Sequence, residues 1–486
     1  MTLSLSRRAA LWGDRTAVVD VDADRRVSYA DLESEADAMA RRLSALGVGP
    51  GDTVTVVSRN RVETLALLFA VRRLGAIFAP VSHRLTPATV ERPLETIDPE
   101  VVVHEEAQRD LVRGLPDEQT HSFEDLGRHE GADYESVERS REDSLLYLHT
   151  EDGERVVDFP ARAVEWNCIT AAAAWGLGRD DCAPALFPFS DADGLLRLAL
   201  PLLYVGGRTA LLRAFNPEDA LSAVEEEGAT LLLGGATEYR ELVENEAFAD
   251  ADLGSVEWFG TRSALPADAR EELARRAPVV RTYGRVDTGP NNLYVPPDRA
   301  SKADGDDDFG PDCVGRPVPD CEVRIAGAGD AEPDSEVGEL QFRGPVTPRG
   351  YLTADGGTDE FSEWVAAGDL AVREDGDYYL VSSAGDSDSS ESESARIDPG
   401  RVERALEARS GVTAAGVVPA SEGVLAAFVG EADPSELREF LGDELPDGAA
   451  LPELDRAESL PRRSTGELDR AALRRQLSGE EQFGEE

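Results

Sequence analysis

Segments typical of β-strands alternate with segments typical of helices along much of the chain, and this alternation restricts the fold more than any other feature. Residues 16–21 (TAVVDV) predict a strand. A helix follows, because apolar residues then recur at three- and four-residue spacing before Gly47: Leu32, Ala36, Met39, Leu43 and Leu46. Residues 51–58, 61–75 and 76–81 continue as strand, helix and strand. This order is typical of βαβ units and predicts an α/β fold with parallel sheets.

The same order returns after residue 217 and changes near residue 312, where short β segments begin. We therefore predict a large N-terminal domain over residues 1–381, with a β-rich subdomain at about 312–381. Residues 382–394 (SSAGDSDSSESES) are polar and of low complexity, which predicts a flexible linker. A small C-terminal α+β domain is expected over 395–476, and a disordered tail over 477–486.

The chain is strongly acidic, with 97 Asp and Glu against 49 Lys and Arg and a formal net charge of −48. The acids are spread along the whole sequence, which favours a solvated surface adapted to molar salt, where the Debye length is only about 3 Å. A cationic partner is the alternative explanation. A nucleic-acid partner is not expected, because no basic stripe exists.

Cysteines, histidines and apolar runs exclude several other classes of protein. The four cysteines form no CxxC pair and the five histidines have no metal-ligand spacing, so neither zinc nor a redox dithiol is indicated. The N-terminus lacks a signal-peptide core. The longest apolar run, 195–207, contains Arg197 and Pro201 and is too short to span a bilayer. We expect a cytoplasmic protein without a membrane span.

Five segments, in their order along the chain, resemble the signatures of the adenylate-forming (AMP-binding) superfamily, and the pattern is nearest to the acyl-CoA synthetases. The segments are 58–87 (SRNRVETLALLFAVRRLGAIFAPVSHRLTP), 314–325 (VGRPVPDCEVRI), 337–352 (VGELQFRGPVTPRGYL), 366–381 (AAGDLAVREDGDYYLV) and 460–473 (LPRRSTGELDRAAL). The resemblance implies that the chain binds ATP and Mg²⁺, joins a carboxylate to AMP, and transfers the acyl group to a thiol such as coenzyme A.

The family's phosphate loop aligns with residues 149–156, and only Gly153 matches it. Acidic or otherwise unsuitable residues hold the hydroxyl and glycine positions, namely His149, Thr150, Glu151 and Asp152, and Val156 stands at the phosphate-binding lysine. Carboxylates facing a triphosphate are repulsive, and the alignment leaves no cation in the loop to offset them. The stretch is therefore interpreted as a former phosphate loop that now forms a plain turn.

Other family positions are partly kept. Tyr283 and Gly284 match the nucleotide motif, whereas Val286 replaces its threonine. Asp287 stands at the magnesium-positioning carboxylate, and an ordinary strand end explains this segment equally well. Asp369 fits the ribose-hydroxyl anchor, with a surface turn as the alternative.

The remaining family positions depart from the pattern. Thr261 and Arg262 replace two glycines beside the adenine, and Asp191 replaces a histidine. At the hinge, Ser383 replaces an arginine while Asp386 is kept. In the C-terminal motif, Thr465 and Gly466 match, but Glu467 replaces the catalytic lysine and inverts its charge.

The sequence thus predicts an adenylate-former fold whose ATP-binding and catalytic motifs are degraded. The first hypothesis is a degenerate relative of acyl-CoA synthetases, with adenylation lost or very weak, that binds an acyl or CoA-type small molecule or a protein partner. The alternative is a divergent but working carboxylic acid–CoA ligase that uses ATP and Mg²⁺. The identity of any acyl ligand and the oligomeric state stay open.

Overall fold

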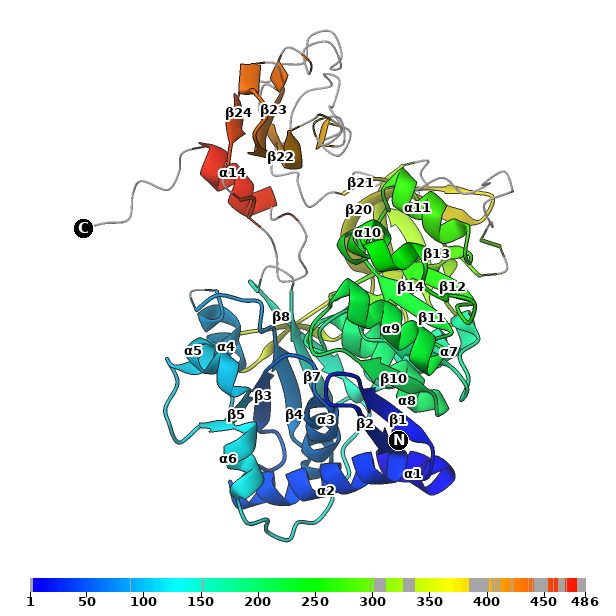
Figure 1. Ribbon diagram of the computed structural model, residues 1–486. Helices are drawn as coiled ribbons and strands as arrows, with labels where there is room; N and C mark the ends of the chain where they lie inside the picture. Colours follow the sequence, from blue (N-terminus) through cyan, green and yellow to red (C-terminus); the bar gives the residue numbers. More distant parts are fainter. Residues whose placement is uncertain are drawn as a thin grey trace, which may run out of the picture. The chain divides into compact units, whose positions relative to one another are not determined.

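The computed structural model divides into two compact units, residues 1–384 and 385–486, and each is described by itself (Figure 1). The structure describes residues 3–87, 89–150, 153–297, 299–300, 312–326, 337–383, 402–403, 406, 409, 411–420, 423–435, 437–438, 440, 453–457, 459–461, 468 and 470–478.

The first sheet of the large unit has eight strands, in the order β19-β18-β8-β7-β4-β3-β5-β6. Strands β3 to β7 pair in parallel, as the βαβ pattern predicts, and β8 returns antiparallel to β7. The strands are β3 Thr53–Val57, β4 Ile77–Val81, β5 Val101–His104, β6 Thr120–Ser122, β7 Ser144–His149, β8 Val156–Pro160, β18 Gly350–Leu352 and β19 Thr358–Glu360.

Local sequence signals set the helices that accompany this sheet. Helix α2 begins at a capping box, in which the Ser28 hydroxyl accepts from the Asp31 amide and the Asp31 carboxylate accepts from the Ser28 amide. Helix α3 ends at Gly75, whose φ of 73° suits glycine. The helices are α1 Leu5–Trp12, α2 Tyr29–Ala45, α3 Val62–Leu74, α4 Glu91–Ile97, α5 Arg109–Val112, α6 Phe123–Arg128 and α7 Ala161–Trp175, with the short 3₁₀ turn η1 Glu106–Gln108.

The second sheet has nine strands, in the order β11-β12-β13-β14-β15-β21-β20-β17-β16. Strands β11 to β13 are parallel and the others are antiparallel. The strands are β11 Leu231–Gly234, β12 Trp258–Thr261, β13 Val279–Arg285, β14 Gly289–Tyr294, β15 Cys313–Pro317, β16 Glu322–Ala326, β17 Gly338–Arg343, β20 Val365–Glu374 and β21 Asp377–Ser383.

A third sheet of four strands, in the order β2-β1-β10-β9, completes the large unit. Its strands are β1 Thr16–Asp20, β2 Arg25–Ser28, β9 Cys182–Pro184 and β10 Arg208–Leu211. The apolar run that begins at Leu195 is buried, as predicted, within the π-helix η2 and helix α8. The remaining helical elements are η2 Asp193–Ala199, α8 Leu200–Val205, α9 Pro217–Glu227, α10 Ala236–Glu244, α11 Ala267–Ala274 and the 3₁₀ turn η3 Glu246–Ala249.

The described part of the small unit contains a three-stranded sheet, β22-β23-β24, and helix α14. These elements are β22 Val412–Ala420, β23 Gly423–Gly430, β24 Glu453–Arg456 and α14 Arg470–Ser478. Among the described residues, no helix is both long and apolar enough to cross a membrane.

The α/β class and the predicted order of strands and helices are confirmed. The β segments of the predicted subdomain are present, but β18 pairs with β8, so part of this segment belongs to the eight-stranded sheet. Strand β21 extends to Ser383, two residues into the predicted linker. The rest of the linker and residues 479–486 of the tail lie outside the described residues. The predicted domain boundaries stay predictions.

Candidate functional site

The turn that joins β7 to β8 is closed by its own hydrogen bonds. The Thr150 amide donates to the Arg155 carbonyl (2.8 Å), and the Gly153 amide donates to the Thr150 carbonyl (2.8 Å). The Arg155 amide donates to the Thr150 hydroxyl (3.1 Å). Gly153 supplies the φ of 72° that this turn requires. A phosphate loop holds phosphate with free backbone N–H groups. These three amides already donate within the turn, so they do not point to a phosphate.

The side chains at the two ends of the turn also have structural partners. Val156 is only 1% exposed and belongs to an apolar cluster with Tyr147 and Leu352. The His149 ring accepts from the Ser82 amide at Nε2 (3.0 Å), and its Nδ1 lies 2.7 Å from the Thr150 carbonyl oxygen. The aligned lysine position therefore lies in the protein core.

A positive charge does remain beside the turn, and the expectation of a loop without any cation was wrong in this respect. Arg155 is exposed, and its guanidinium carbon lies 4.2 Å from the centre of the Tyr351 ring. Tyr351 in turn donates to Asp287 Oδ2 (2.8 Å). Sequence reasoning missed Arg155 because it lies one residue before the aligned lysine position, Val156, and so falls outside the motif. The arginine links the turn to the end of β13.

The structure brings together three of the predicted site residues, Tyr283, Asp287 and Asp369. The Tyr283 hydroxyl donates to Asp369 Oδ2, and both residues are 6% exposed. Arg285, which sequence analysis did not single out, lies between the two acids, with Nη1 3.7 Å from Asp369 Oδ2 and Nε 3.6 Å from Asp287 Oδ1. Burial raises the pKa of the Asp369 carboxyl, and the bond from Tyr283 and the charge of Arg285 offset this only in part.

These residues do not fit a magnesium ion. Asp287 Oδ2 already accepts from Tyr351, and its buried Oδ1 has the Arg285 guanidinium nearby without a hydrogen bond. A divalent cation bound there would be repelled by this positive charge. Mg²⁺ would also need further oxygen ligands beside Asp287. In the part of the chain that the structure describes, no group of three or more His, Cys, Asp and Glu side chains could hold a metal.

Gly284 has a packing role that is independent of any ligand. A Cβ atom at this position would lie 2.4 Å from the Pro290 carbonyl oxygen on the paired strand β14. The next residue but one, Val286, packs at the edge of the main apolar core. The match at Gly284 therefore carries no information about nucleotide binding.

The departures at Arg262 and Asp191 belong to one network around the buried Asp193. Arg262 Nε lies 2.9 Å from Asp193 Oδ2, and its guanidinium carbon lies 5.7 Å from the centre of the Phe187 ring. Asp191 Oδ1 accepts from the Asp193 amide (2.9 Å) at the start of η2. Asp191 thus accepts a hydrogen bond at the start of η2. Arg262 forms an ion pair with Asp193.

Arg197 extends this network to β13. Its side chain is 1% exposed and lies 3.1 Å from Asp193, four residues earlier. It also donates to Thr282 Oγ1 (3.0 Å) and to the Gly284 carbonyl (2.8 Å), on either side of Tyr283. Arg197 therefore fixes the strand that presents Tyr283. Sequence analysis noted Arg197 only as an interruption of an apolar run.

Several predicted positions lie outside the described residues: Glu151, Asp152, Asp386, Thr465, Gly466 and Glu467. Ser383 is the last residue of β21. Thr261, at the other glycine position, ends β12, is 3% exposed, and donates to the Ser263 carbonyl (2.8 Å).

The chain belongs to the AMP-binding enzyme family, whose model matches residues 5–152 and 157–352. The matched region is interrupted between residues 152 and 157, within the turn described above.

Curated relatives of the chain are acid–CoA ligases. The chain is 30% identical over 403 residues to a feruloyl-CoA synthase from Amycolatopsis sp, covering 81% of this chain and 80% of the relative. It is 27% identical over 404 residues to an indoleacetate–CoA ligase from Aromatoleum aromaticum, covering 77% and 76%. It is 25% identical over 486 residues to a 2-succinylbenzoate–CoA ligase from Bacillus thuringiensis, covering 97% of each. The acyl-CoA synthetase relationship is therefore confirmed.

Solved structures confirm the fold. The O-succinylbenzoate coenzyme A synthetase from Bacillus subtilis, in complex with ATP and magnesium, superposes with a TM-score of 0.83 at 21% identity, covering 97% of this chain and 98% of that one. ATP-bound MatB from Rhodopseudomonas palustris gives a TM-score of 0.80 at 22% identity, covering 98% and 99%.

Proposed function

We propose that this member of the family has lost adenylation or retains it only at a very low rate. The observation that carries this proposal is the β7–β8 turn, whose Thr150, Gly153 and Arg155 amides bond within the turn. Catalysis of phosphoryl and adenylyl transfer depends mainly on positioning and electrostatic stabilisation, so a closed turn removes its chief phosphate-holding element. In this proposal the chain acts by binding an acyl or CoA-type ligand, or a protein partner such as an active relative.

Two further observations support the same proposal. Val156, at the aligned lysine position, is buried among apolar side chains, so this position offers no charged group to a phosphate. Asp287 is occupied by Tyr351 and faces Arg285, so the site does not suit Mg²⁺. The sequence adds Glu467 in place of the second lysine.

A divergent working ligase is the second candidate, and the two arginines favour it. Arg155 and Arg285 place positive charge on either side of Tyr351 and Asp287. A ligase that uses ATP in this way would recruit guanidinium groups in place of lysine. This candidate would use ATP and Mg²⁺ as the family does.

ATP–pyrophosphate exchange separates the two candidates. The purified chain is assayed in molar KCl with Mg²⁺ and a panel of aromatic, short-chain, medium-chain and long-chain acids, beside an active 2-succinylbenzoate–CoA ligase. We expect exchange to be lower by at least about 10²-fold, the usual effect of losing one preorganised transition-state contact. Glu467→Lys should not restore it. Robust exchange with any acid, lost on Arg155→Ala or Arg285→Ala, would establish the divergent ligase instead.

A further inference from the structure

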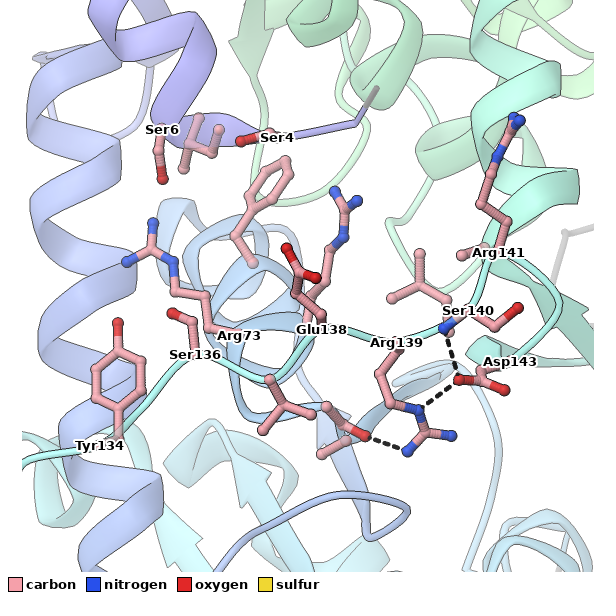
Figure 2. A pocket seen from close by; sticks show the side chains of 18 of the residues that line it. Ser4, Ser6, Arg73, Tyr134, Ser136, Glu138, Arg139, Ser140, Arg141 and Asp143 are labelled. Atoms are coloured by element: carbon pink, nitrogen blue, oxygen red, sulfur yellow. Dashed lines mark hydrogen bonds and ion pairs between the residues drawn. The ribbon is translucent and has the colours of Figure 1, made fainter. Parts of the chain in front are cut away.

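A pocket lies in the large unit beside the end of α3, within the first family-like segment, 58–87, but apart from the aligned nucleotide positions. Its volume is about 620 Å³, within the range of small-molecule sites. Its walls come from the start of α1, from α2, from the end of α3, and from the segment 134–145 that leads into β7 (Figure 2). The proposed loss of adenylation does not involve any residue that lines this pocket.

The pocket reverses the charge balance of the chain. Five arginines line it with only four acids, whereas the whole sequence has 97 acids and 49 basic residues. The arginines are Arg7, Arg72, Arg73, Arg139 and Arg141, and the acids are Glu33, Asp37, Glu138 and Asp143. On a chain with a net charge of −48, such a concentration of arginine needs a local reason.

Two of the lining arginines, Arg72 and Arg141, share one buried carboxylate that lies behind the pocket lining. Glu165, which is fully buried, is shared by Arg72 Nη2 at 3.5 Å and Arg141 Nε at 2.9 Å. Arg8, itself 7% exposed, lies close enough to Arg72 for the two charges to repel. Burial lowers the pKa of Arg72 to about 10; the charge of Glu165 opposes this shift, and the repulsion by Arg8 adds to it to a smaller extent. Two guanidiniums of the lining thus share a single carboxylate, and an anion in the pocket would supply a second negative charge to them.

The wall of the pocket is held in place without a ligand. The Val137 amide donates to the Arg73 carbonyl (2.8 Å), and Arg139 donates to the Gly75 carbonyl (2.8 Å). Arg139 also pairs with Asp143 through Nε (2.8 Å), as the dashed lines in Figure 2 show. These bonds fasten the segment before β7 to the end of α3, so the pocket is preorganised.

We propose that this pocket binds a small organic anion through a phosphate or carboxylate group. Guanidinium groups recognise both kinds of anion by paired, charge-assisted hydrogen bonds. Phe69 and Tyr134 add aromatic surface for the rest of the molecule, and Ser136 and Ser140 add hydroxyl groups among the lining residues. Figure 2 shows Arg73, Tyr134, Ser136 and Arg139 along one stretch of the cavity.

Isothermal titration calorimetry with two probes, inorganic phosphate and citrate, tests this proposal. Both are titrated into the full chain in KCl at constant ionic strength. We expect saturable binding of at least one probe. Binding of phosphate alone assigns the site to phosphate esters, and binding of citrate alone assigns it to carboxylates. No saturable binding of either probe would overturn the proposal.

Matched variants locate the binding. Arg141→Ala, at a side chain that is 46% exposed, should weaken binding about tenfold, the usual effect of losing one charge-assisted bond. Arg275→Ala, which removes an arginine paired with two acids on the surface of α11, should leave affinity unchanged. Arg285→Ala should also leave it unchanged, which separates this pocket from the nucleotide position. Circular dichroism verifies that each variant is folded. Equal affinity in Arg141→Ala and the wild type, or loss in Arg285→Ala alone, would overturn the proposal.

Discussion

The two hairpins at the family's nucleotide position have changed in different ways. In the β7–β8 hairpin, the turn is closed by hydrogen bonds around Thr150, and Val156 is part of the core. In the β13–β14 hairpin, Tyr283 and Asp287 keep the family's residue or its charge, and Tyr283 bonds to Asp369 on β20. The first hairpin matches the family at one aligned position, Gly153. In the second hairpin, Tyr283 and Asp287 still lie near Asp369.

If adenylation is lost as proposed, the comparison indicates which parts of a ligand site persist without a ligand. A loop that binds phosphate through its backbone leaves those amides without partners inside the loop, so on this proposal substitutions allow the amides to bond to one another's residues instead. Tyr283 and Asp369 join two strands of one sheet, and removing either would leave a buried polar group without its partner. We infer that this pair is retained because it also holds the sheet together.

The largest expected effect is that of salt on the stability of the whole fold, both hairpins included. The formal charge of −48 is screened in molar salt and repels itself when salt is removed. Dilution from about 3 M to about 0.1 M KCl, where the Debye length rises from below 3 Å to about 10 Å, should lower the melting temperature strongly. Circular dichroism follows the transition. An unchanged melting temperature would refute the adaptation to high salt.

Substitution of Val156 by Lys should be the most damaging single change in the first hairpin. The lysine would place an unpaired charge in the cluster formed with Tyr147 and Leu352, at a cost of about 3 kcal/mol in the free energy of unfolding. Urea denaturation in molar KCl measures this loss.

Val156→Ile is the matched control, since it keeps a β-branched apolar side chain and adds only one methylene, which should cost about 1 kcal/mol. If Val156→Lys were as stable as the wild type and gained pyrophosphate exchange, position 156 would face the nucleotide and the closed-turn account would fail.

The corresponding change in the second hairpin is Tyr283→Phe. It removes the hydroxyl that donates to Asp369 and leaves a buried carboxylate with one partner fewer. We expect the free energy of unfolding to fall by about 1–3 kcal/mol. Tyr294→Phe on β14, at a partly buried tyrosine, is the control and should have a smaller effect. Equal effects of the two substitutions would show that the Tyr283–Asp369 bond does not hold the sheet.

The ionisation of Asp369 should change the free energy of unfolding by a smaller amount, and the direction of this change with pH can be stated. Burial raises the pKa of Asp369 in the folded state, so the folded protein binds this proton more tightly than the unfolded chain. The ionised carboxyl therefore destabilises the fold above its folded pKa, and this destabilisation disappears as the pH falls towards the unfolded value.

Asp369→Asn removes this titration and keeps an oxygen acceptor for Tyr283. The stability of the variant relative to the wild type should be greatest near about pH 7 and should decrease towards about pH 4, near the unfolded pKa of aspartate. Denaturation curves of both proteins at several pH values, in the same KCl concentration, measure the difference. A difference that grows on acidification would contradict the raised pKa.

Much of this fold follows from the sequence, because its signals are local. The apolar period before Gly47 and the glycine at position 75 predict α2 and α3, and both helices are present. Tyr283 and Asp369 were each singled out from the family resemblance, and the structure joins them by a hydrogen bond that no local pattern predicts. Arg285, by contrast, acquires its role only when β20 brings Asp369 beside it, 84 residues along the chain, and no local pattern records such a contact.

The smallest effect should come from Gly153→Ala in the closed turn. With a φ of 72°, alanine at this position is strained by about 1–2 kcal/mol, and the nearest atom to its Cβ would be the Thr89 carbonyl oxygen at 3.6 Å, an ordinary contact. Gly228→Ala, at a φ of 59° with nothing within 4 Å, is the matched control and should cost about as much. Equal losses in urea denaturation, with no change in the affinity for ATP, would identify the turn as a plain structural hairpin. A clear loss of ATP affinity in Gly153→Ala alone would show that the turn still contacts the nucleotide, and the distinction between the two hairpins would then be wrong.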